Sequence, residues 1–388
     1  MQIRPFNLLL NANISKHVEQ FILLLTCLCV YSPGWWAQEF VFDDREAILN
    51  NPVVTGKKHW SEVLWRDYWG HPIALSSSHK SYRPVTTLTF VLEHAAFGLQ
   101  PFVHRITNIF LHALVTLQIY KLVAKLLNLF KIKQKERENT SAYLSNSNDC
   151  TISKEFLVAM VFAVHPIHSE AVCNIVGRAE LLMNLLQPPM IVYFALAALS
   201  MFSKEQGIVI LPICIVFDWL APDHNTKRLI KHRSILLLCV LFFLLILRVY
   251  INNFQTPIFS KEDNPAAFLP TAHMRALNYL YIWLLNIWLL VKPNQLSFDY
   301  SSGCVPIINT VFEKRSFICL LTVLMSSLVL ASYTYRLDCG KNKHRLFIFL
   351  TLFGSLTFLP SSNLLVTVGF TLAERVLYLP SFPLFIWC

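Results

Sequence analysis

Long apolar runs recur along this sequence at about the length that a helix needs to cross a lipid bilayer. A helix rises about 1.5 Å per residue, so roughly 20 apolar residues span a hydrocarbon core of about 30 Å. The clearest runs are residues 21–36, 106–129, 234–250, 317–333 and 346–365. Because lipid leaves no backbone hydrogen bond to water, these runs predict an all-α, polytopic helical membrane protein.

The composition favours the same class. The chain is 55% hydrophobic and 14% charged, whereas soluble domains average about 45–50% apolar and about 25% charged residues. Further apolar segments lie at residues 156–164, 181–202, 208–220, 276–291 and 376–388. We therefore expect one membrane domain over residues 1–388, with about nine to eleven membrane segments.

The net charge of +10 is concentrated in short segments beside the apolar runs. Lys and Arg in such positions mark the cytoplasmic side of a membrane protein, whereas nucleic-acid binding would need them on one soluble face. We therefore predict cytoplasmic loops and no nucleic-acid partner. The residues concerned are Lys121, Lys125, Lys131, Lys133, Lys135, Arg137, Lys227, Arg228, Lys231, Arg233, Arg336, Lys341, Lys343 and Arg345.

The first apolar run is predicted to be a retained span rather than a cleaved signal peptide. Trp35 and Trp36 stand where a cleavage site needs small residues, and tryptophans favour membrane interfaces. A large lumenal loop then covers residues 38–105. Counting spans between the charged loops gives the wrong parity twice, so residues 276–291 are either a span or an interfacial or re-entrant helix, and Pro188-Pro189 marks a broken or missing span.

Asp43 and Asp44 follow the first span directly, and they are the candidate catalytic pair. A carboxylate within reach of a hydroxyl can take its proton, although simple solvated residues outside the membrane are the alternative. Later in the same loop, His79, Lys80, Tyr82 and Arg83 could clamp a phosphate. His104 and Asn108 lie one turn apart and are expected to share a helix face. His79 and His104 are expected to line a cavity.

Polar residues near the ends of later apolar runs are expected to line a cavity. His165, His168 and Glu170 surround Pro166, which should break a helix. Zinc is an alternative for these three side chains, but the usual spacing is absent and we expect no metal. The charged sets Arg178 with Glu180, Lys204 with Glu205, and Glu374 with Arg375 should pair with each other or hold an anionic lipid headgroup.

Several sequence blocks, in this order, resemble the transmembrane and tetratricopeptide-repeat-containing O-mannosyltransferases. They extend over nearly the whole chain. The blocks are Phe42-Asp43-Asp44, Asn50-Asn51-Pro52, Trp69-Gly70, residues 78–84, residues 88–90, residues 104–108 with His112, residues 165–172, residues 177–182, residues 203–207 and residues 373–381.

The resemblance implies a GT-C-like helical bundle in the endoplasmic reticulum membrane with a lumenal active site. Such enzymes transfer mannose from dolichyl-phosphate-mannose to Ser or Thr of secretory-pathway proteins such as cadherins. The family's acidic motif falls on Asp43 and Asp44, one of which would be the base. Lys80, Arg83 and Arg375 would bind the donor phosphate, the apolar spans would hold its lipid tail, and no cofactor is expected.

Two departures from the family leave other functions open. The family's tetratricopeptide repeats are expected to be absent from this chain, and the stretch between Glu180 and Lys204 is shorter than in the family. A truncated isoform or an inactive membrane scaffold is therefore the alternative function. A transporter is a weaker third possibility, because the chain has no repeated halves of the kind many transporters show.

The predicted orientation can be checked by glycosylation. Asn13-Ile14-Ser15 and Asn139-Thr140-Ser141 both fit the acceptor pattern, but both lie on the predicted cytoplasmic side. We expect no glycan at either site when the protein is expressed in microsomes and treated with a glycosidase. A glycan on Asn139 would invert the proposed orientation.

Overall fold

The computed structural model describes residues 16–130, 152–186, 193–221, 227–336 and 341–387. Within these ranges the chain is helical and forms no strand beyond an isolated bridge between Arg66 and Pro72. The α-helices are α1 (Lys16–Trp35), α2 (Pro84–Phe97), α3 (Pro101–Leu129), α4 (Lys154–Val164), α5 (Ser169–Cys173), α6 (Arg178–Leu185), α7 (Tyr193–Ser203), α8 (Ile210–Leu220), α9 (Lys227–Ile251), α10 (Ala272–Val291), α11 (Lys314–Arg336), α12 (Lys341–Phe358) and α13 (Ser381–Trp387).

Short helical turns connect these helices and carry many of the polar residues. The first, η1 (Arg45–Leu49), is a π-helical turn. The others are 3₁₀ turns: η2 (Trp60–Leu64), η3 (Pro166–His168), η4 (Ile175–Gly177), η5 (Glu205–Val209), η6 (Pro265–Phe268), η7 (Leu359–Ser361) and η8 (Glu374–Leu377).

In the described residues, four helices are long and apolar enough to cross a membrane. They are Pro101–Leu129, Lys227–Ile251, Ala272–Val291 and Lys341–Ser361, and the bent pair Lys154–Val164 with Pro166–Cys173 makes a possible fifth. The all-helical membrane class is thus confirmed. We expected about nine to eleven membrane segments, whereas the described residues contain four such helices, or five with the bent pair.

Several predicted segments form helices that are too short to cross a bilayer. Helices α7 and α8 have 11 residues each, and a helix of that length reaches only about 17 Å. The last apolar segment, residues 376–388, was expected to be a span, but it contains only the seven residues of α13 after η8 and Pro380. The Pro188-Pro189 junction lies outside the described residues.

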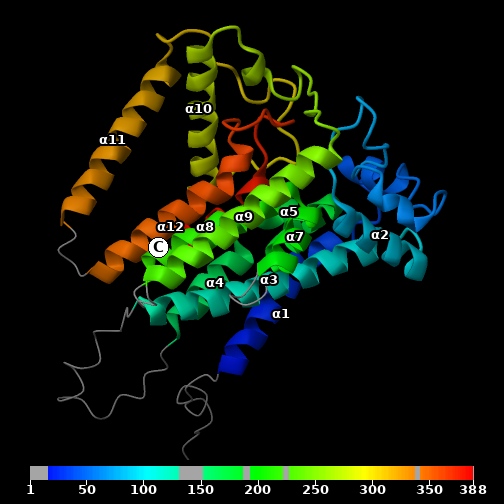
Figure 1. Ribbon diagram of the computed structural model, residues 1–388, viewed down its shortest axis with the longest axis horizontal. Helices are drawn as coiled ribbons and strands as arrows, with labels where there is room; N and C mark the ends of the chain where they lie inside the picture. The colour runs from blue at the N-terminus through cyan, green and yellow to red at the C-terminus, as the bar shows by residue number, and fades with distance from the viewer. Residues whose placement is uncertain (1–15, 131–151, 187–192, 222–226, 337–340, 388) are drawn as a thin grey trace, which may run out of the picture.

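Helix α10 corresponds to the segment with two alternative predictions. Its 20 residues are long and apolar enough for a crossing. In Figure 1 α10 runs at a steep angle to α9 and α12, and α11 is in contact with it. Both alternatives for this segment, a span and an interfacial or re-entrant helix, stay predictions.

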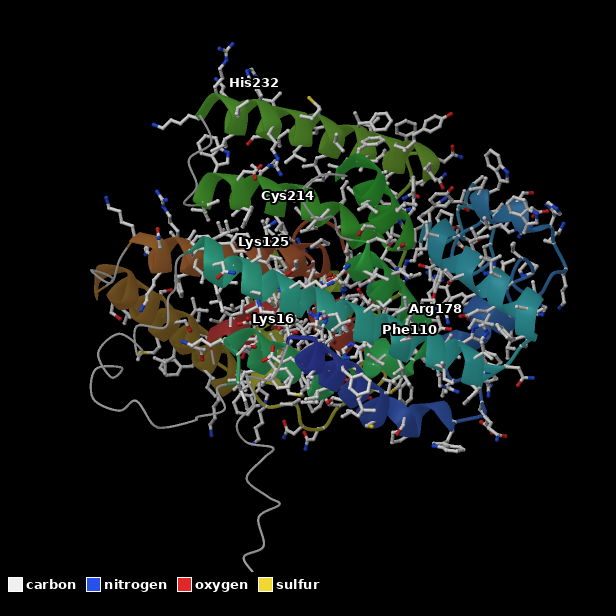
Figure 2. The ribbon with its side chains drawn as sticks, turned by 90° about the horizontal axis from the view of Figure 1, so that it is seen from below. Lys16, Phe110, Lys125, Arg178, Cys214 and His232 are labelled. Carbon is white, nitrogen blue, oxygen red and sulfur yellow. The ribbon has the colours of Figure 1, made fainter. Side chains whose placement is uncertain are left out.

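Basic residues gather at one end of the bundle. Figure 2 places Lys125, near the end of α3, and His232, in the first turns of α9, at the end opposite to Arg178. The loop after α1 and helix α2 occupy the Arg178 end. That the two ends lie on opposite sides of a membrane stays a prediction of the sequence.

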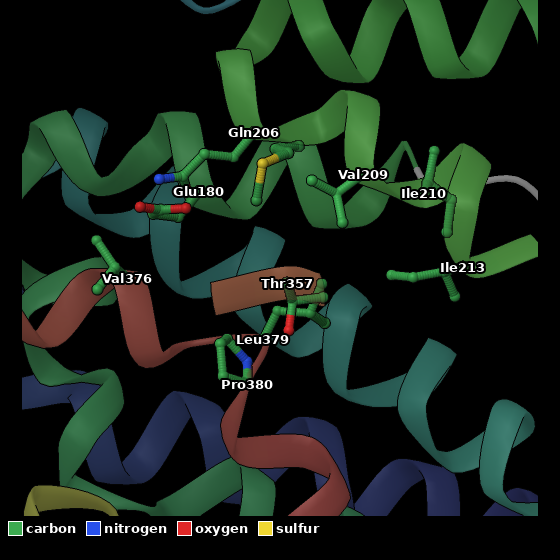
Figure 3. A pocket seen from close by; sticks show the side chains of 10 residues that line it. Glu180, Gln206, Val209, Ile210, Ile213, Thr357, Val376, Leu379 and Pro380 are labelled. Carbon is green, nitrogen blue, oxygen red and sulfur yellow. The ribbon is translucent and has the colours of Figure 1, made fainter. Parts of the chain in front are cut away.

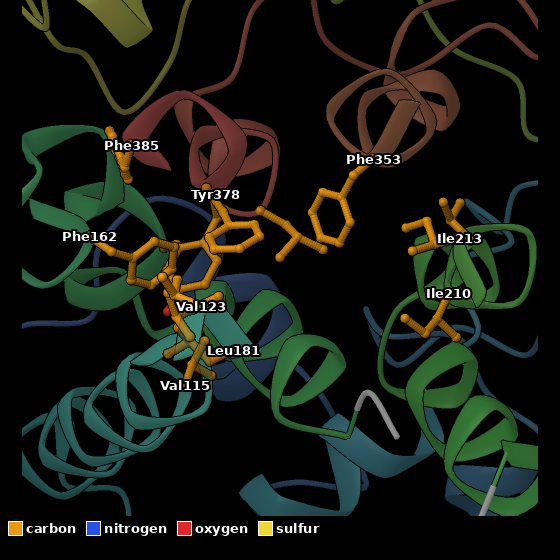
Figure 4. Packing of buried hydrophobic residues seen from close by; sticks show 14 of the residues in the cluster. Val115, Val123, Phe162, Leu181, Ile210, Ile213, Phe353, Tyr378 and Phe385 are labelled. Carbon is orange, nitrogen blue, oxygen red and sulfur yellow. The ribbon is translucent and has the colours of Figure 1, made fainter. Parts of the chain in front are cut away.

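The main core joins the amino-terminal helices to the carboxyl-terminal segment. Val115 and Val123 of α3 belong to the same buried cluster as Phe162 of α4 and Tyr378, which follows η8. Figure 4 shows these side chains between helices that are far apart in the sequence. This packing holds the segment around Tyr378 against α3 and α4, and η8 lies against α5 and η3.

Pro166 breaks the chain between α4 and α5, as predicted. The two halves are bent by 52°, because proline has no N–H to donate and clashes with a continuing helix. A second tight point follows at Gly177, where a Cβ atom would lie 2.2 Å from the carbonyl oxygen of Ala171. Only glycine therefore fits at the end of η4.

Replacing this glycine should loosen the turn that carries Val176. We expect Gly177→Ala to lower the free energy of unfolding by about 1–3 kcal/mol, the usual cost of overpacking, measured by thermal unfolding in detergent. Gly354→Ala is the matched control, because its Cβ would meet Pro383 at an ordinary 3.6 Å. That change, inside helix α12, should be neutral or slightly stabilising. Equal effects of the two substitutions would contradict the close-packing argument.

Candidate active site

A guanidinium from the carboxyl-terminal segment lies between two carboxylates at the Arg178 end of the bundle. Arg375 Nη1 is 3.3 Å from Asp43 Oδ2 and 3.1 Å from Glu170 Oε1. The backbone N–H of Arg375 also donates to Glu170 Oε2 at 2.8 Å. One arginine therefore joins the loop after α1, helix α5 and η8.

The loop after α1 is held so that Asp43 reaches this arginine. Arg105, on α3, donates to the carbonyl oxygens of Ala37 and Glu39, the latter at 2.6 Å. Phe42 then has a φ of +47°, a conformation that side chains with a Cβ rarely adopt. The sharp change of direction at Phe42 separates the environments of the two aspartates that follow.

The two aspartates have different environments. The Asp43 side chain is 21% exposed and pairs with Arg375. Asp44 is fully buried and accepts N–H bonds from Val41 and Val176, each at 3.2 Å. The geometry thus leaves Asp43 as the candidate base and argues against Asp44, whose carboxylate anchors the loop to η4.

Burial also changes the ionisation of Asp44. Loss of solvent raises its pKa from 3.8 to about 6, against the opposing effect of the two backbone N–H bonds and of Arg105. Glu374 behaves similarly, since burial raises its pKa from 4.5 to about 7 although Tyr300 and Ser297 donate to it. Both groups therefore hold a proton more readily than an exposed carboxyl group.

A second group of charges lies around Glu205, at the start of η5. Arg83 Nε approaches Glu205 Oε2 at 3.1 Å, and Arg248 Nη2 approaches Oε1 at 3.0 Å. The Arg83 guanidinium also lies 4.9 Å above the ring of Tyr68. The Arg83 side chain is 17% exposed, and its partner in the structure is a carboxylate.

Lys204 lies near both groups of charges. It pairs with Glu180 in α6, while the like charges of Arg83 and Arg375 repel it and the carboxylates of Glu205 and Glu170 attract it. Of the predicted charged sets, only Lys204 and Glu180 pair with each other; Arg178, Glu205 and Arg375 pair with residues outside the sets, and Glu374 accepts from Ser297 and Tyr300. Four cations (Arg83, Lys204, Arg248 and Arg375) meet four carboxylates (Asp43, Glu170, Glu180 and Glu205) in this part of the described chain.

A small enclosed cavity lies next to Glu180. Its polar end is formed by Glu180 and Gln206, and its apolar wall includes Val209, Ile213 and Leu379. Figure 3 shows these side chains around it. The cavity has a volume of about 10 Å³, enough for about one water molecule. It is too small for a sugar, so we do not place a mannosyl group there.

Lys80 is not available for the phosphate role that the sequence suggested. It is 3% exposed, and its Nζ donates to the carbonyl oxygens of Ile73 and Leu75 at 2.7 and 2.8 Å. An ammonium that is buried and hydrogen-bonded in this way stabilises the loop fold. We therefore remove Lys80 from the candidate phosphate ligands.

Two predicted cavity residues belong instead to a buried network. Arg178 is fully buried and donates to Asn108, Thr89, Glu93 and the carbonyl oxygen of His104. His104 is also buried and pairs with Glu93. The prediction that His104 and Asn108 share a helix face is confirmed, but the face is packed against Arg178 rather than exposed to a cavity.

The other histidines predicted to line a cavity, His79, His165 and His168, contact neighbouring residues of the protein. His168 is fully buried, with Nδ1 bonded to the carbonyl oxygen of Phe162 and Nε2 to the hydroxyl of Ser381. His165 accepts the N–H of Ile167, and exposed His79 lies beside the rings of Trp69 and Phe259. Among the described residues, no three metal-binding side chains converge, so the zinc alternative gains no support.

Sequence reasoning missed Arg248, Arg105 and Glu93. A signal existed for Arg248, because it is a single charge within the apolar run of α9, and such charges face the protein interior by default. Arg105 and Glu93 gave no comparable signal, since each lies among mixed polar residues at the edge of a helix. Their partners are separated from them in the sequence and depend on the fold.

The fold and the charges define a polytopic helical membrane protein with an acid–base cluster at one mouth of its bundle. Residues 253–327 match the family model described as "Protein O-mannosyl-transferase TMTC, DUF1736". This segment includes η6, α10 and part of α11.

Curated relatives match nearly the whole chain. The chain is 37% identical over 378 residues to "Protein O-mannosyl-transferase F38B6.6" of Caenorhabditis elegans. This match covers 95% of this chain and 50% of that protein. It is 32% identical over 415 residues to human "Protein O-mannosyl-transferase TMTC3", covering 95% of this chain and 42% of the relative. Human "Protein O-mannosyl-transferase TMTC4" is 32% identical over 397 residues, and that match covers 88% of this chain and 51% of the relative.

The chain is therefore related to the TMTC protein O-mannosyl-transferases, as its sequence blocks predicted. It spans about half the length of the curated relatives that it matches. No solved structure matches it.

The buried state of Asp44 should be measurable as a pH dependence. Because its folded pKa of about 6 exceeds 3.8, the folded protein binds more protons than the unfolded chain between these pH values. The free energy of unfolding should therefore fall as the pH rises through this window, by roughly 1–3 kcal/mol, and then level off.

Asp44→Asn should remove this part of the pH dependence. Thermal unfolding in detergent at pH 4, 5, 6 and 7 measures it, with exposed Glu46→Gln as the matched control. Identical pH profiles for the wild type and Asp44→Asn would show that Asp44 does not titrate as its burial suggests.

Proposed function

We propose that this chain carries the transfer centre of a protein O-mannosyltransferase of the endoplasmic reticulum membrane, with its active site on the lumenal side. The donor is dolichyl-phosphate-mannose, and the acceptors are Ser or Thr residues of secretory-pathway proteins such as cadherins. The relatives' names support the reaction. The observation that carries the proposal is the pairing of the partly exposed Asp43 with Arg375.

Asp43 is the proposed general base. A neutral hydroxyl is a weak nucleophile, and removal of its proton while the new bond forms lowers the barrier. The acceptor oxygen forms a bond to the anomeric carbon as the bond from that carbon to the phosphate oxygen breaks. The proton passes to Asp43, and the leaving lipid phosphate keeps the electron pair. A single displacement of this kind inverts the anomeric configuration.

Arg375 and Arg83 are the proposed ligands of the donor phosphate. Fixed cations stabilise the negative charge that develops on a leaving phosphate, so no protein acid and no metal is required. Both guanidinium groups are partly exposed, at 24% and 17%. Each is at present paired with a carboxylate, so phosphate binding would replace one ion pair with another.

The exposed apolar surfaces of the membrane helices are the proposed site of the lipid tail. Leu236, Phe242 and Ile246 of α9 are examples of such exposed residues. The acceptor would approach from the lumen, over the loop that follows α1. The proposed partners are thus the lipid-linked donor, membrane lipid and secretory or cell-surface proteins.

A non-catalytic membrane scaffold is the second candidate function. The observation in its favour is that Arg83, Lys204, Arg248 and Arg375 all have carboxylate partners. A set of ion pairs of this kind can serve only to hold helices together. The two functions differ in whether the wild-type protein transfers mannose and in whether that transfer needs the charge of Asp43.

Asp43→Asn in the full-length protein separates them. General base catalysis contributes about 10²–10⁴-fold in rate, so we expect a loss of at least about 10²-fold in kcat for mannose transfer from dolichyl-phosphate-mannose to a cadherin domain. Donor binding should not weaken, because Arg375 loses a carboxylate that competes with the phosphate. Glu46→Gln, an exposed carboxylate in the same loop, is the matched control and should retain activity. Wild-type transfer by Asp43→Asn would remove Asp43 from the mechanism, whereas no transfer by the wild-type protein itself would favour the scaffold.

A further inference from the structure

The loop after α10 contacts the residue that precedes Arg375. The hydroxyl of Tyr300 donates to Glu374 Oε1 at 2.8 Å, and the backbone N–H of Ser297 donates to the same oxygen at 2.7 Å. Glu374 is 2% exposed. Two donors therefore hold one buried carboxyl group, immediately before the arginine that pairs with Asp43.

The same loop contacts the residue that precedes Asp43. The ring of Phe298 lies edge-on to the ring of Phe42, with centroids 5.4 Å apart. Edge-to-face aromatic pairs at this distance attract each other beyond their buried area. Phe42 is also the residue with a φ of +47°, so its ring contact supports a backbone conformation that is unfavourable in isolation.

Bonds within the loop make it a compact unit. Asp299 accepts the N–H and the hydroxyl of Ser301 at 2.9 and 2.7 Å, and the hydroxyl of Ser297 donates to the carbonyl oxygen of Asp299 at 2.8 Å. Leu296 and Tyr300 pack against the apolar cluster that contains Leu372 and Val376. The segment that carries η8 lies beside the end of α10 in Figure 1.

We propose that residues 295–301 are a positioning element for the transfer centre, in which Phe298 fixes Asp43 through Phe42 and Tyr300 fixes Arg375 through Glu374. The proposal deepens the proposed function and rests on it, because it assigns a role to residues that touch neither the base nor the phosphate ligands directly. The element lies within residues 253–327, the part of the chain matched by the family model.

The high exposure of the two contacting rings favours a positioning role over a purely structural one. Phe298 is 63% exposed and Phe42 is 47% exposed, so their contact buries little area and contributes little to global stability. What the contact does constrain is the direction of Phe42, and hence of the next side chain. The Tyr300 hydroxyl likewise adds one bond at the edge of a cluster that is already packed.

The test compares four variants of the full-length protein in lipid nanodiscs. Tyr300→Phe removes one hydroxyl and keeps the ring, while Phe298→Ala removes a ring. Phe298→Tyr keeps an aromatic partner for Phe42. Phe312→Ala removes a fully exposed ring from the same segment and is the matched control.

Kinetics should separate positioning from stability. Small displacements of reacting groups cost up to about 10²-fold in rate, so Tyr300→Phe and Phe298→Ala should each lower kcat by about tenfold or more. The KM for dolichyl-phosphate-mannose and the melting temperature should stay near the wild-type values. Phe298→Tyr and Phe312→Ala should behave like the wild type.

A second readout does not depend on transfer activity. The N–H groups of Asp44 and Arg45 donate to the carbonyl oxygens of Val41 and Phe42 at 2.9 and 3.2 Å, and hydrogen exchange reports how often these bonds open. Residues 41–46 should exchange faster in Tyr300→Phe and Phe298→Ala, but not in the other two variants.

The possible outcomes are distinct. Unchanged exchange at residues 41–46 in both variants overturns the positioning element, whatever the activity. Faster exchange with unchanged kcat also overturns it, because the loop would then hold the turn without affecting transfer. Unchanged transfer by Asp43→Asn would instead refute the proposed function, and exchange would still report separately on the loop.

Discussion

The ion pairs of Arg375 join three parts of the chain: the loop after α1, helix α5 and η8. This arginine and Asp43 are 332 residues apart in the sequence, yet their side chains are in contact and Glu170 contacts the same guanidinium nitrogen. Glu170 is almost fully buried, so it depends on a cation for compensation. Removing one partner of a buried pair typically costs about 3–5 kcal/mol, because the other charge is left without compensation. The packing of α3, α4 and η8 serves to bring these three groups together.

The membrane character of the chain could be predicted because lipid imposes a simple rule on composition. The spans in α3 and α9 follow from their apolar runs, and the break at Pro166 follows from the chemistry of proline. The pairing of charged residues was also predictable in kind, since ionisable groups near a membrane interior seek partners. The individual partners could not be predicted from the sequence. Arg375, for example, pairs with Asp43 and Glu170 and not with the adjacent Glu374.

The candidate site illustrates the same limit. Asp43 and Asp44 are identical side chains in adjacent positions, and only the fold makes one partly exposed and the other buried. Their difference arises from the φ of Phe42 and from the N–H of Val176, which lies 132 residues away. Lys80 was misjudged for a related reason, since its carbonyl partners come from a loop whose conformation has no periodic pattern in the sequence. The short length of α7 and α8 was not predicted, because hydropathy shows which residues are apolar but not where a helix ends.

One link between the membrane and the site has a mechanical consequence. Arg248, in the last turn of α9, donates to the carbonyl oxygens of Tyr82 and Lys80 at 2.7 and 2.8 Å and also pairs with Glu205. Helix α9 is long and apolar, and most of its apolar window is not buried against the rest of the described chain, so that surface is available to lipid. A change in the tilt of α9 would act through Arg248 on the backbone of Lys80 and Tyr82, next to Arg83. The charged cluster is thus joined, through a single guanidinium, to a helix whose outer surface suits lipid.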